Sequence, residues 1–70
     1  MNKGIVKKVS SIRGFGFIVD DSLCEDVFFH AKDCENGIFD RDLVGKEVQY
    51  NLIQTSKGKS GIQVNLVDHE

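Results

Sequence analysis

The chain contains no proline and no tryptophan, and only two cysteines among its 70 residues. No apolar run is long enough to span a bilayer, and lysines interrupt any signal-peptide core within residues 1–8. We therefore expect a cytoplasmic protein without a membrane partner. In that reducing compartment, Cys24 and Cys34 are expected to be free thiols. The length predicts one domain over residues 1–70.

Signatures of catalysis and of metal binding are also missing. No phosphate-binding loop, paired carboxylates or nucleophile motif is present, so we expect no enzyme, no cofactor and no small-molecule substrate. Four potential metal ligands occur close together in the sequence: Cys24, His30, Asp33 and Cys34. Their spacings match no zinc signature, so no metal site is expected. The cysteines form no Cys-x-x-Cys motif that would support a redox role.

The net charge of −2 is unevenly distributed along the chain. Residues 1–19 contain four basic residues and no acidic residue, whereas residues 20–70 contain five basic and eleven acidic residues. The local distribution matters more than the sum for an anionic partner, because a basic patch attracts phosphate even on an acidic protein. Charge alone leaves open that this short segment is basic without a function.

Short β-like stretches are separated by breaks that contain Gly, Asn, Asp or Ser. The expected strands cover residues 3–10, 14–20, 25–30, 46–54 and 61–67. Residues 31–34 are expected to form a helical turn, and residues 56–60 a hairpin loop. Five short strands with one long irregular connection predict an all-β fold closed into a small barrel. Closure would also protect the edge strands of so small a protein.

Aromatic side chains alternate in the second and third expected strands. Alternate side chains in a strand share a face, so Phe15 and Phe17 point the same way, as do Phe28 and His30. The opposite faces supply the expected core together with aliphatic residues of other strands: Val6, Ile18, Val27, Phe29, Val48 and Leu66. A sheet closed on itself has one interior, so the four rings are expected to face outward.

An outward patch of rings beside cations suits single-stranded nucleic acid. Bases stack on aromatic rings largely irrespective of sequence, and cations neutralise phosphates. Three cations are expected to border the rings: Lys7, Lys8 and Arg13. The alternative is that Phe15 and Phe17 are core residues and that Gly14 and Gly16 only form turns. The pattern by itself does not decide between these two readings.

At these residues the sequence resembles the bacterial cold-shock proteins and the cold-shock domains of Y-box proteins. Residues 13–18, Arg-Gly-Phe-Gly-Phe-Ile, are similar to the family's first ribonucleoprotein motif, usually Lys-Gly-Phe-Gly-Phe-Ile. Residues 27–30, Val-Phe-Phe-His, are similar to the second motif, usually Val-Phe-Val-His. Residues 3–7 and 64–66 match the family's opening and closing strands. The resemblance thus covers nearly the whole chain.

The resemblance implies a five-stranded antiparallel OB-fold barrel that binds single-stranded RNA and DNA. It implies base stacking on Phe15, Phe17, Phe28 and His30, with Lys7 and Arg13 on the same face. Phe39 is similar to an aromatic residue in the family's long loop that caps one end of the platform. Such proteins act as ATP-independent RNA chaperones or antiterminators. A monomer is expected, with a domain-swapped dimer as the alternative because the long loop could act as a hinge.

The chain departs from the family pattern in two places where aromatic residues are usual. The family usually has Trp-Phe after Lys7, where this chain has Lys8 and Val9, and an aromatic after the His, where this chain has Ala31. Two stacking platforms are therefore missing, which predicts a weaker and more salt-sensitive binder. The same departures support an alternative function, an OB-fold protein–protein module that has lost nucleic-acid binding.

Overall fold

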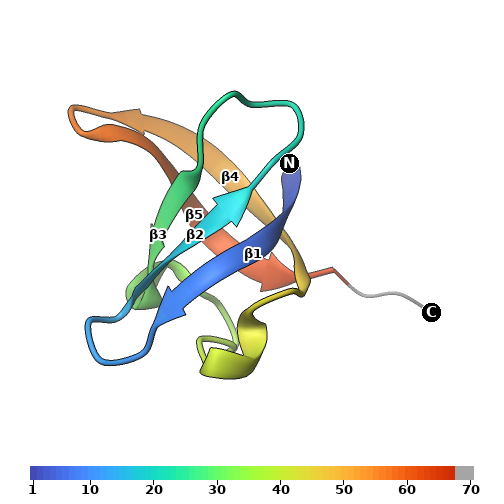
Figure 1. The fold of residues 1–70 in the computed structure, drawn as a ribbon, viewed down its shortest axis with the longest axis vertical. Coiled ribbons are helices and arrows are strands. Elements are labelled where there is room, and N and C mark those ends of the chain that lie inside the picture. Colours follow the sequence, from blue (N-terminus) through green and yellow to red (C-terminus); the bar gives the residue numbers. More distant parts are fainter. Residues whose placement is uncertain (68–70) are drawn as a thin grey trace.

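The computed structural model describes residues 1–67. They fold into a closed barrel of five strands (Figure 1). The strands are β1 (Asn2–Ser10), β2 (Phe15–Val19), β3 (Val27–His30), β4 (Glu47–Thr55) and β5 (Gly58–Leu66). Their order around the barrel is β1-β2-β3-β5-β4. Neighbouring strands are antiparallel except β3 and β5, which pair in parallel through Phe28 and Ser60. The predicted all-β barrel is confirmed, with this one parallel contact completing the closure.

The strand boundaries differ most from expectation at the β4–β5 hairpin. A loop over residues 56–60 was expected, but only Ser56 and Lys57 lie between the strands, and Thr55 pairs with Gly58. The Thr55 hydroxyl accepts a hydrogen bond from the Lys57 backbone N–H (3.2 Å) and donates one to the Gly58 carbonyl (2.8 Å). Gly58 has φ 129°, a value that favours glycine. These features allow a tight turn, so β5 begins earlier than expected.

The barrel interior holds eight buried hydrophobic side chains: Val6, Ile18, Val27, Phe29, Leu43, Val48, Tyr50 and Val64. Five of the six expected core residues are among them. Leu66 was wrongly assigned to the core and is 40% exposed. It lies at the end of β5, where it lines an open groove with Ile5 and Lys46 instead of reaching the interior. Val64, two residues earlier, supplies the buried side chain of β5.

The long connection between β3 and β4 covers one end of the barrel (Figure 1). The expected helical turn is confirmed as the 3₁₀ helix η1 (Ala31–Asp33), and a second one, η2 (Arg41–Leu43), was not predicted. Leu43 of η2 enters the core, so the connection contributes to the interior as well as linking strands. Neither helix, nor any other within residues 1–67, is long and apolar enough to cross a membrane.

A buried polar contact joins β4 to the end of β2. Asp20 is 6% exposed and accepts a 2.6 Å hydrogen bond from the Tyr50 hydroxyl. It also accepts hydrogen bonds from the Ser22 hydroxyl (2.6 Å) and backbone N–H (3.0 Å). The Ser22 hydroxyl, followed by the Tyr50 hydroxyl, lowers the pKa of Asp20 below its ordinary value despite burial. Burial, and then the contact with Asp20, raises the pKa of Tyr50 above its ordinary range.

Candidate nucleic-acid interface

Three phenylalanine rings from β2 and β3 form a cluster, called here the ring cluster: Phe15, Phe17 and Phe28. The centroid of Phe28 lies 5.8 Å from that of Phe15 and 5.9 Å from that of Phe17, and the Phe15–Phe17 distance is 5.9 Å. The strand register brings these rings together, because Phe17 pairs with Phe28 and Phe15 pairs with His30. Directly paired residues share a face of the sheet. The four aromatic residues therefore lie on one face, as the sequence predicted.

That face is the outside of the barrel. Phe28 is 37% exposed, and the other two rings of the cluster are half-buried. The alternating residues Ile18, Val27 and Phe29 are 0% exposed. The reading in which Phe15 and Phe17 are core residues is therefore wrong. The interior is already filled by the opposite faces of the same strands.

The two glycines that flank Phe15 have different structural roles. Gly14 has φ 73° in the turn between β1 and β2, a conformation that L side chains rarely adopt. Gly16 faces the interior, where a Cβ would lie 2.7 Å from Cζ of Phe29 and 2.6 Å from the backbone oxygen of Lys8. Glycine is therefore required at position 16 so that the Phe29 ring can pack against β2.

His30 is held at the edge of the ring cluster by its neighbours. Its Nδ1 accepts a hydrogen bond from the Lys32 backbone N–H (3.2 Å), and its own backbone N–H donates to Asp33 (3.3 Å). These contacts cap η1 and fix the orientation of the imidazole. The other ring nitrogen, Nε2, is not used in this cap, so it can offer a hydrogen bond to a ligand.

A β-bulge in β1 places two lysines on the outside of the barrel. Val6 pairs with Ile18 and Lys8 pairs with Phe17, so Lys7 is the extra residue. Both lysines are exposed, and Lys8 shares the face of Phe17. The Lys7 ammonium lies 3.2 Å from the Asp26 carboxylate, so its charge is partly neutralised.

The remaining predicted residues lie in two different places. Arg13 is exposed in the turn between β1 and β2, next to Gly14, whose backbone lies near the imidazole of His30. Phe39 is half-buried and packs edge-on against the core ring of Phe29, with centroids 6.1 Å apart. Its ring contact is therefore with the interior and not with the ring cluster.

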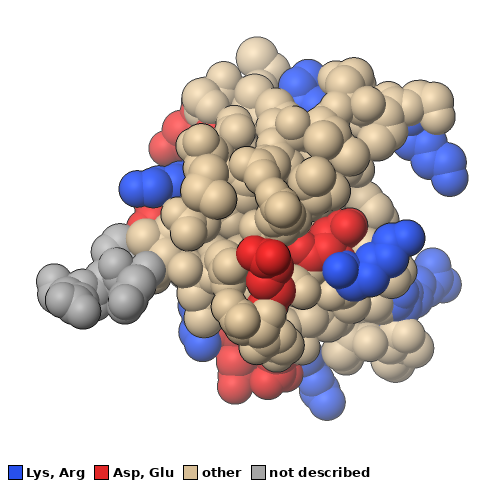
Figure 2. Space-filling view, turned by 180° about the vertical axis from the view of Figure 1, so that it is seen from behind, with Lys and Arg blue, Asp and Glu red and all other residues tan. Residues whose placement is uncertain are grey.

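The structure mixes charges that the sequence separates. Lys7 of the basic first segment faces Asp26, and Lys59 lies 3.0 Å from Glu25. On the face seen in Figure 2, acidic and basic side chains lie beside one another. The positive charge near the rings is thus set by which cations are left without an acidic partner. Within residues 1–67, Lys8 and Arg13 form no ion pair.

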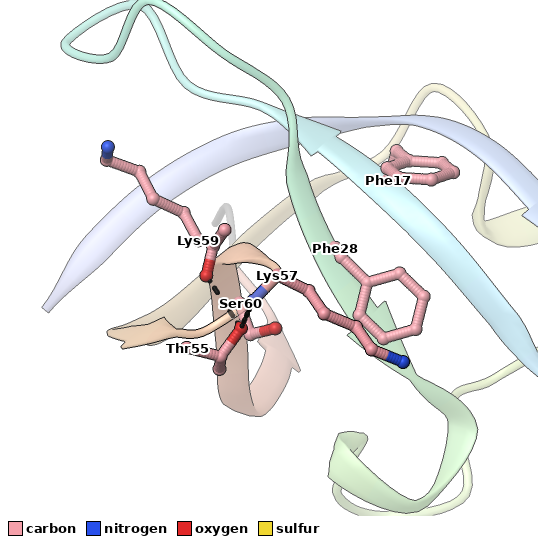
Figure 3. A pocket seen from close by; sticks show the side chains of 7 residues that line it. Phe17, Phe28, Thr55, Lys57, Lys59 and Ser60 are labelled. Atoms are coloured by element: carbon pink, nitrogen blue, oxygen red, sulfur yellow. Dashed lines mark hydrogen bonds between the residues drawn. The ribbon is translucent and has the colours of Figure 1, made fainter.

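The residue pattern did not predict a groove that lies beside the ring cluster. It is lined by Phe17 and Phe28 on one side and by residues of the β4–β5 hairpin on the other: Thr55, Lys57, Gly58, Lys59 and Ser60 (Figure 3). The two lysines that flank a glycine in the hairpin were a possible signal in the sequence. Their proximity to the rings depends on barrel closure through Phe28 and Ser60, which the sequence does not reveal.

The two cysteines lie in different surroundings. Burial, with a smaller contribution from the charge of Asp33, raises the pKa of the Cys34 thiol to about 11, which disfavours the reactive thiolate. Cys24 is exposed, and both thiols are free. In the described part of the chain, no three His, Cys, Asp or Glu residues are grouped closely enough to hold a metal ion.

Comparison with known proteins identifies the family. The model of the 'Cold-shock' DNA-binding domain matches residues 2–67. Cold shock protein CspA of Rhizobium meliloti is 41% identical over 61 residues, which cover 86% of this chain and 88% of that protein. The cold shock protein of Arthrobacter globiformis is 36% identical over 67 residues, or 96% of this chain and 100% of that protein. The chain therefore belongs to the cold-shock DNA-binding domain family.

Proposed function

We propose that this chain is a single cold-shock domain that binds single-stranded RNA and DNA in the cytoplasm, without enzymatic activity. The observation that carries the proposal is the ring cluster on the outside of the barrel. The centroids of its three rings lie within 6 Å of one another, and the side chains on the opposite faces of the same strands are buried. Exposed aromatic patches of this kind mark interaction surfaces, and bases stack on them without sequence-specific contacts.

The proposed site contains the ring cluster and the polar groups around it. His30 stacks on or hydrogen-bonds a base, and the cations Lys7, Lys8 and Arg13 meet phosphates. Phe39 belongs to this site only if it leaves its contact with Phe29, because that contact directs its ring to the core. Binding requires no metal, nucleotide cofactor or small-molecule substrate in this mechanism.

The proposed activity is that of an ATP-independent RNA chaperone or a regulator of transcription or translation. Bases stacked on the protein cannot pair with each other, so binding holds a strand open. A few stacked bases contribute about 1–3 kcal/mol each, which is enough to melt a weak hairpin but not a long duplex. We propose that the protein acts as a monomer, with domain swapping through the long connection as the alternative.

The replacements at Lys8 and Ala31 weaken binding in this proposal. Each missing platform removes about 1 kcal/mol at the low end of the stacking range, so the affinity falls roughly 30-fold in total. Lys8 recovers part of this loss through a phosphate, which increases the salt dependence. The protein is thus proposed to bind a shorter segment, and more weakly, than a member with both aromatic residues.

An NMR titration with an unstructured pyrimidine-rich heptamer at two salt concentrations tests the proposed function. Large shifts are expected for the ring signals of Phe15, Phe17 and Phe28, and the binding is expected to weaken at the higher salt concentration. Unshifted ring signals would instead support the OB-fold protein–protein module. That alternative is not favoured, because the family match and the outward rings both point to nucleic acid.

A further inference from the structure

The 3₁₀ helix η1 positions the imidazole of His30 at the end of β3. The Asp33 carboxylate accepts a hydrogen bond from the His30 backbone N–H (3.3 Å), and Nδ1 of the imidazole accepts one from the Lys32 backbone N–H (3.2 Å). The Ala31 backbone N–H donates to the Gly14 carbonyl (2.8 Å), which fastens η1 to the turn between β1 and β2. The place of the imidazole beside the ring cluster therefore depends on η1.

The contact with Lys32 also assigns the proton of the imidazole. A ring nitrogen that accepts a hydrogen bond carries no proton, so the neutral ring carries its proton on Nε2. A doubly protonated imidazole has two donors and no acceptor, so it could not make this contact. While η1 is closed, His30 is thus a neutral ring that donates from Nε2.

Small residues flank the edge of the ring that carries Nε2. A Cβ at position 14 would lie 3.9 Å from Nε2 of His30 and 3.7 Å from the Ala31 methyl group, but Gly14 has no side chain. The family usually has an aromatic residue at position 31, and this chain has only a methyl group there. Within residues 1–67, Nε2 has no hydrogen-bond partner, so a ligand that reaches this edge finds an unused donor.

A carbonyl oxygen of a pyrimidine base matches this donor. Phe15 pairs directly with His30 across β2 and β3, so a base that stacks on Phe15 has its edge beside the imidazole. A neutral N–H suits an uncharged carbonyl oxygen. The adjoining phosphate is better matched by the exposed guanidinium of Arg13, in the turn next to Gly14.

We propose that Asp33 is a positioning residue for nucleic-acid binding: it holds His30 as a neutral donor to a carbonyl oxygen of the base that stacks on Phe15. Asp33 does not touch the strand. Its carboxylate closes the turn that directs the Lys32 N–H at Nδ1, and this contact in turn orients Nε2 toward the ligand. The inference rests on the proposed function, and it offsets part of the stacking that Ala31 cannot provide.

The sign of the effect separates positioning from simple electrostatics. Asp33 is a negative charge close to a surface that meets phosphates, so charge alone predicts that its removal strengthens binding. Positioning predicts the opposite for Asp33→Ala, because the imidazole is then free to turn and Nε2 no longer points at the base. Asp33→Asn removes the charge but keeps an oxygen that accepts from the His30 N–H.

The test measures the affinity of labelled heptathymidine by fluorescence anisotropy at pH 7.5. Asp33→Ala is expected to bind about fivefold more weakly than wild type, the usual net effect of one hydrogen bond, whereas Asp33→Asn should bind at least as tightly as wild type. In a His30→Phe background, which keeps a ring for stacking but has no donor, Asp33→Ala should not weaken binding further.

Asp40→Ala is the matched control. The Asp40 carboxylate caps the other 3₁₀ helix, η2, by accepting a hydrogen bond from the Arg41 backbone N–H (2.6 Å). The substitution removes the same charge and the same kind of cap, and it should not weaken binding. Urea denaturation of each variant confirms that it is folded under the assay conditions.

Two further measurements follow the imidazole and its acceptor. Nitrogen-15 NMR should show an unprotonated Nδ1 and a protonated Nε2 in wild type, and an average over both tautomers in Asp33→Ala. A loss of stability alone would not produce this change. Sulfur accepts hydrogen bonds weakly, so the fivefold difference should shrink with a strand of either 2-thiothymidine or 4-thiothymidine.

An affinity of Asp33→Ala equal to or above that of wild type would overturn the positioning role even though the rings still bind. An undiminished difference with both thio strands would overturn the base carbonyl as the acceptor. If Asp33→Ala does not fold, a wild-type Nδ1 that carries the proton would overturn the proposal instead. If wild type binds no oligothymidine at all, the proposed function itself fails.

Discussion

Phe28 carries more of the proposed function than any other single side chain, because it contacts both other rings and lines the groove. At 37% exposure it is also among the least protected aromatic residues of the described chain. A ring so placed contributes to ligand binding more than to the core.

We predict that Phe28→Ala weakens binding to a pyrimidine-rich strand about tenfold, within the range of one lost stacking contact. Urea denaturation is expected to change much less than for a core Phe→Ala substitution, which costs about 3–5 kcal/mol. Ile53→Ala is a suitable control, because Ile53 is 38% exposed on β4 and is not part of the ring cluster. Equal affinities of Phe28→Ala and wild type would contradict the prediction.

The contact of Tyr50 with Asp20 makes stability depend on pH. The pKa of Asp20 is lower in the folded protein than its ordinary value of 3.8, so the folded state favours the ionised carboxylate. The resulting stabilisation is present above that ordinary pKa, and it is lost as the pH falls through the lowered pKa of the folded state.

We predict that Tyr50→Phe, which keeps the buried ring, destabilises the protein by about 1.5–3 kcal/mol at pH 7, the usual contribution of a hydrogen bond to a charged group. The loss of stability from pH 6 to pH 3 should be smaller in the variant than in wild type. Urea denaturation at both pH values measures this. Parallel losses in the two proteins would show that the hydroxyl does not hold the Asp20 carboxylate in its ionised form.

At the scale of the strand, β1 presents a lysine where the family usually presents a ring. The bulge at Lys7 turns Lys8 toward the face of Phe17, so position 8 is already oriented toward the ring cluster. The backbone that would support a further platform is thus present, and only the side chain differs.

We predict that Lys8→Trp strengthens binding about fivefold at physiological salt, because one stacking contact at the low end of its range replaces a charge. Its affinity should also depend less on salt than that of wild type, by about 0.7 in the slope of log K against log salt. Lys46→Trp removes the same charge far from the rings and should reproduce neither effect. A Lys8→Trp affinity at or below that of wild type would mean that this position lies outside the bound strand.

Over the whole molecule the net charge is −2, so the attraction of an anionic strand depends on cations that lie close to the binding surface. Lys7 and Lys59 are engaged by Asp26 and Glu25, which leaves three unpaired cations near the rings within residues 1–67: Lys8, Arg13 and Lys57. An acidic protein can bind nucleic acid in this way, but the interaction depends on few phosphates.

We predict that log K for wild type falls with log salt with a slope of about −1.4 or steeper, which corresponds to at least two phosphates of a single strand. Titrations with a pyrimidine-rich heptamer from low to physiological salt measure it, and urea denaturation at the same salt concentrations controls for changes in folding. Nanomolar affinity that stays constant over this range would contradict both the slope and the expected loss of stacking.

Features that follow from local patterns could be predicted from the amino-acid sequence alone. Alternation predicted which face carries Phe15, Phe17 and Phe28, and five strand-like stretches predicted the barrel, because the side-chain period of a strand is set by its backbone. Contacts between residues far apart in the chain required the tertiary structure. They include the closure of β3 on β5, the place of Leu43 in the core and the exposure of Leu66. The groove and the ion pairs of Lys7 and Lys59 belong here too, because closing the barrel is what brings β1, β3 and the hairpin together.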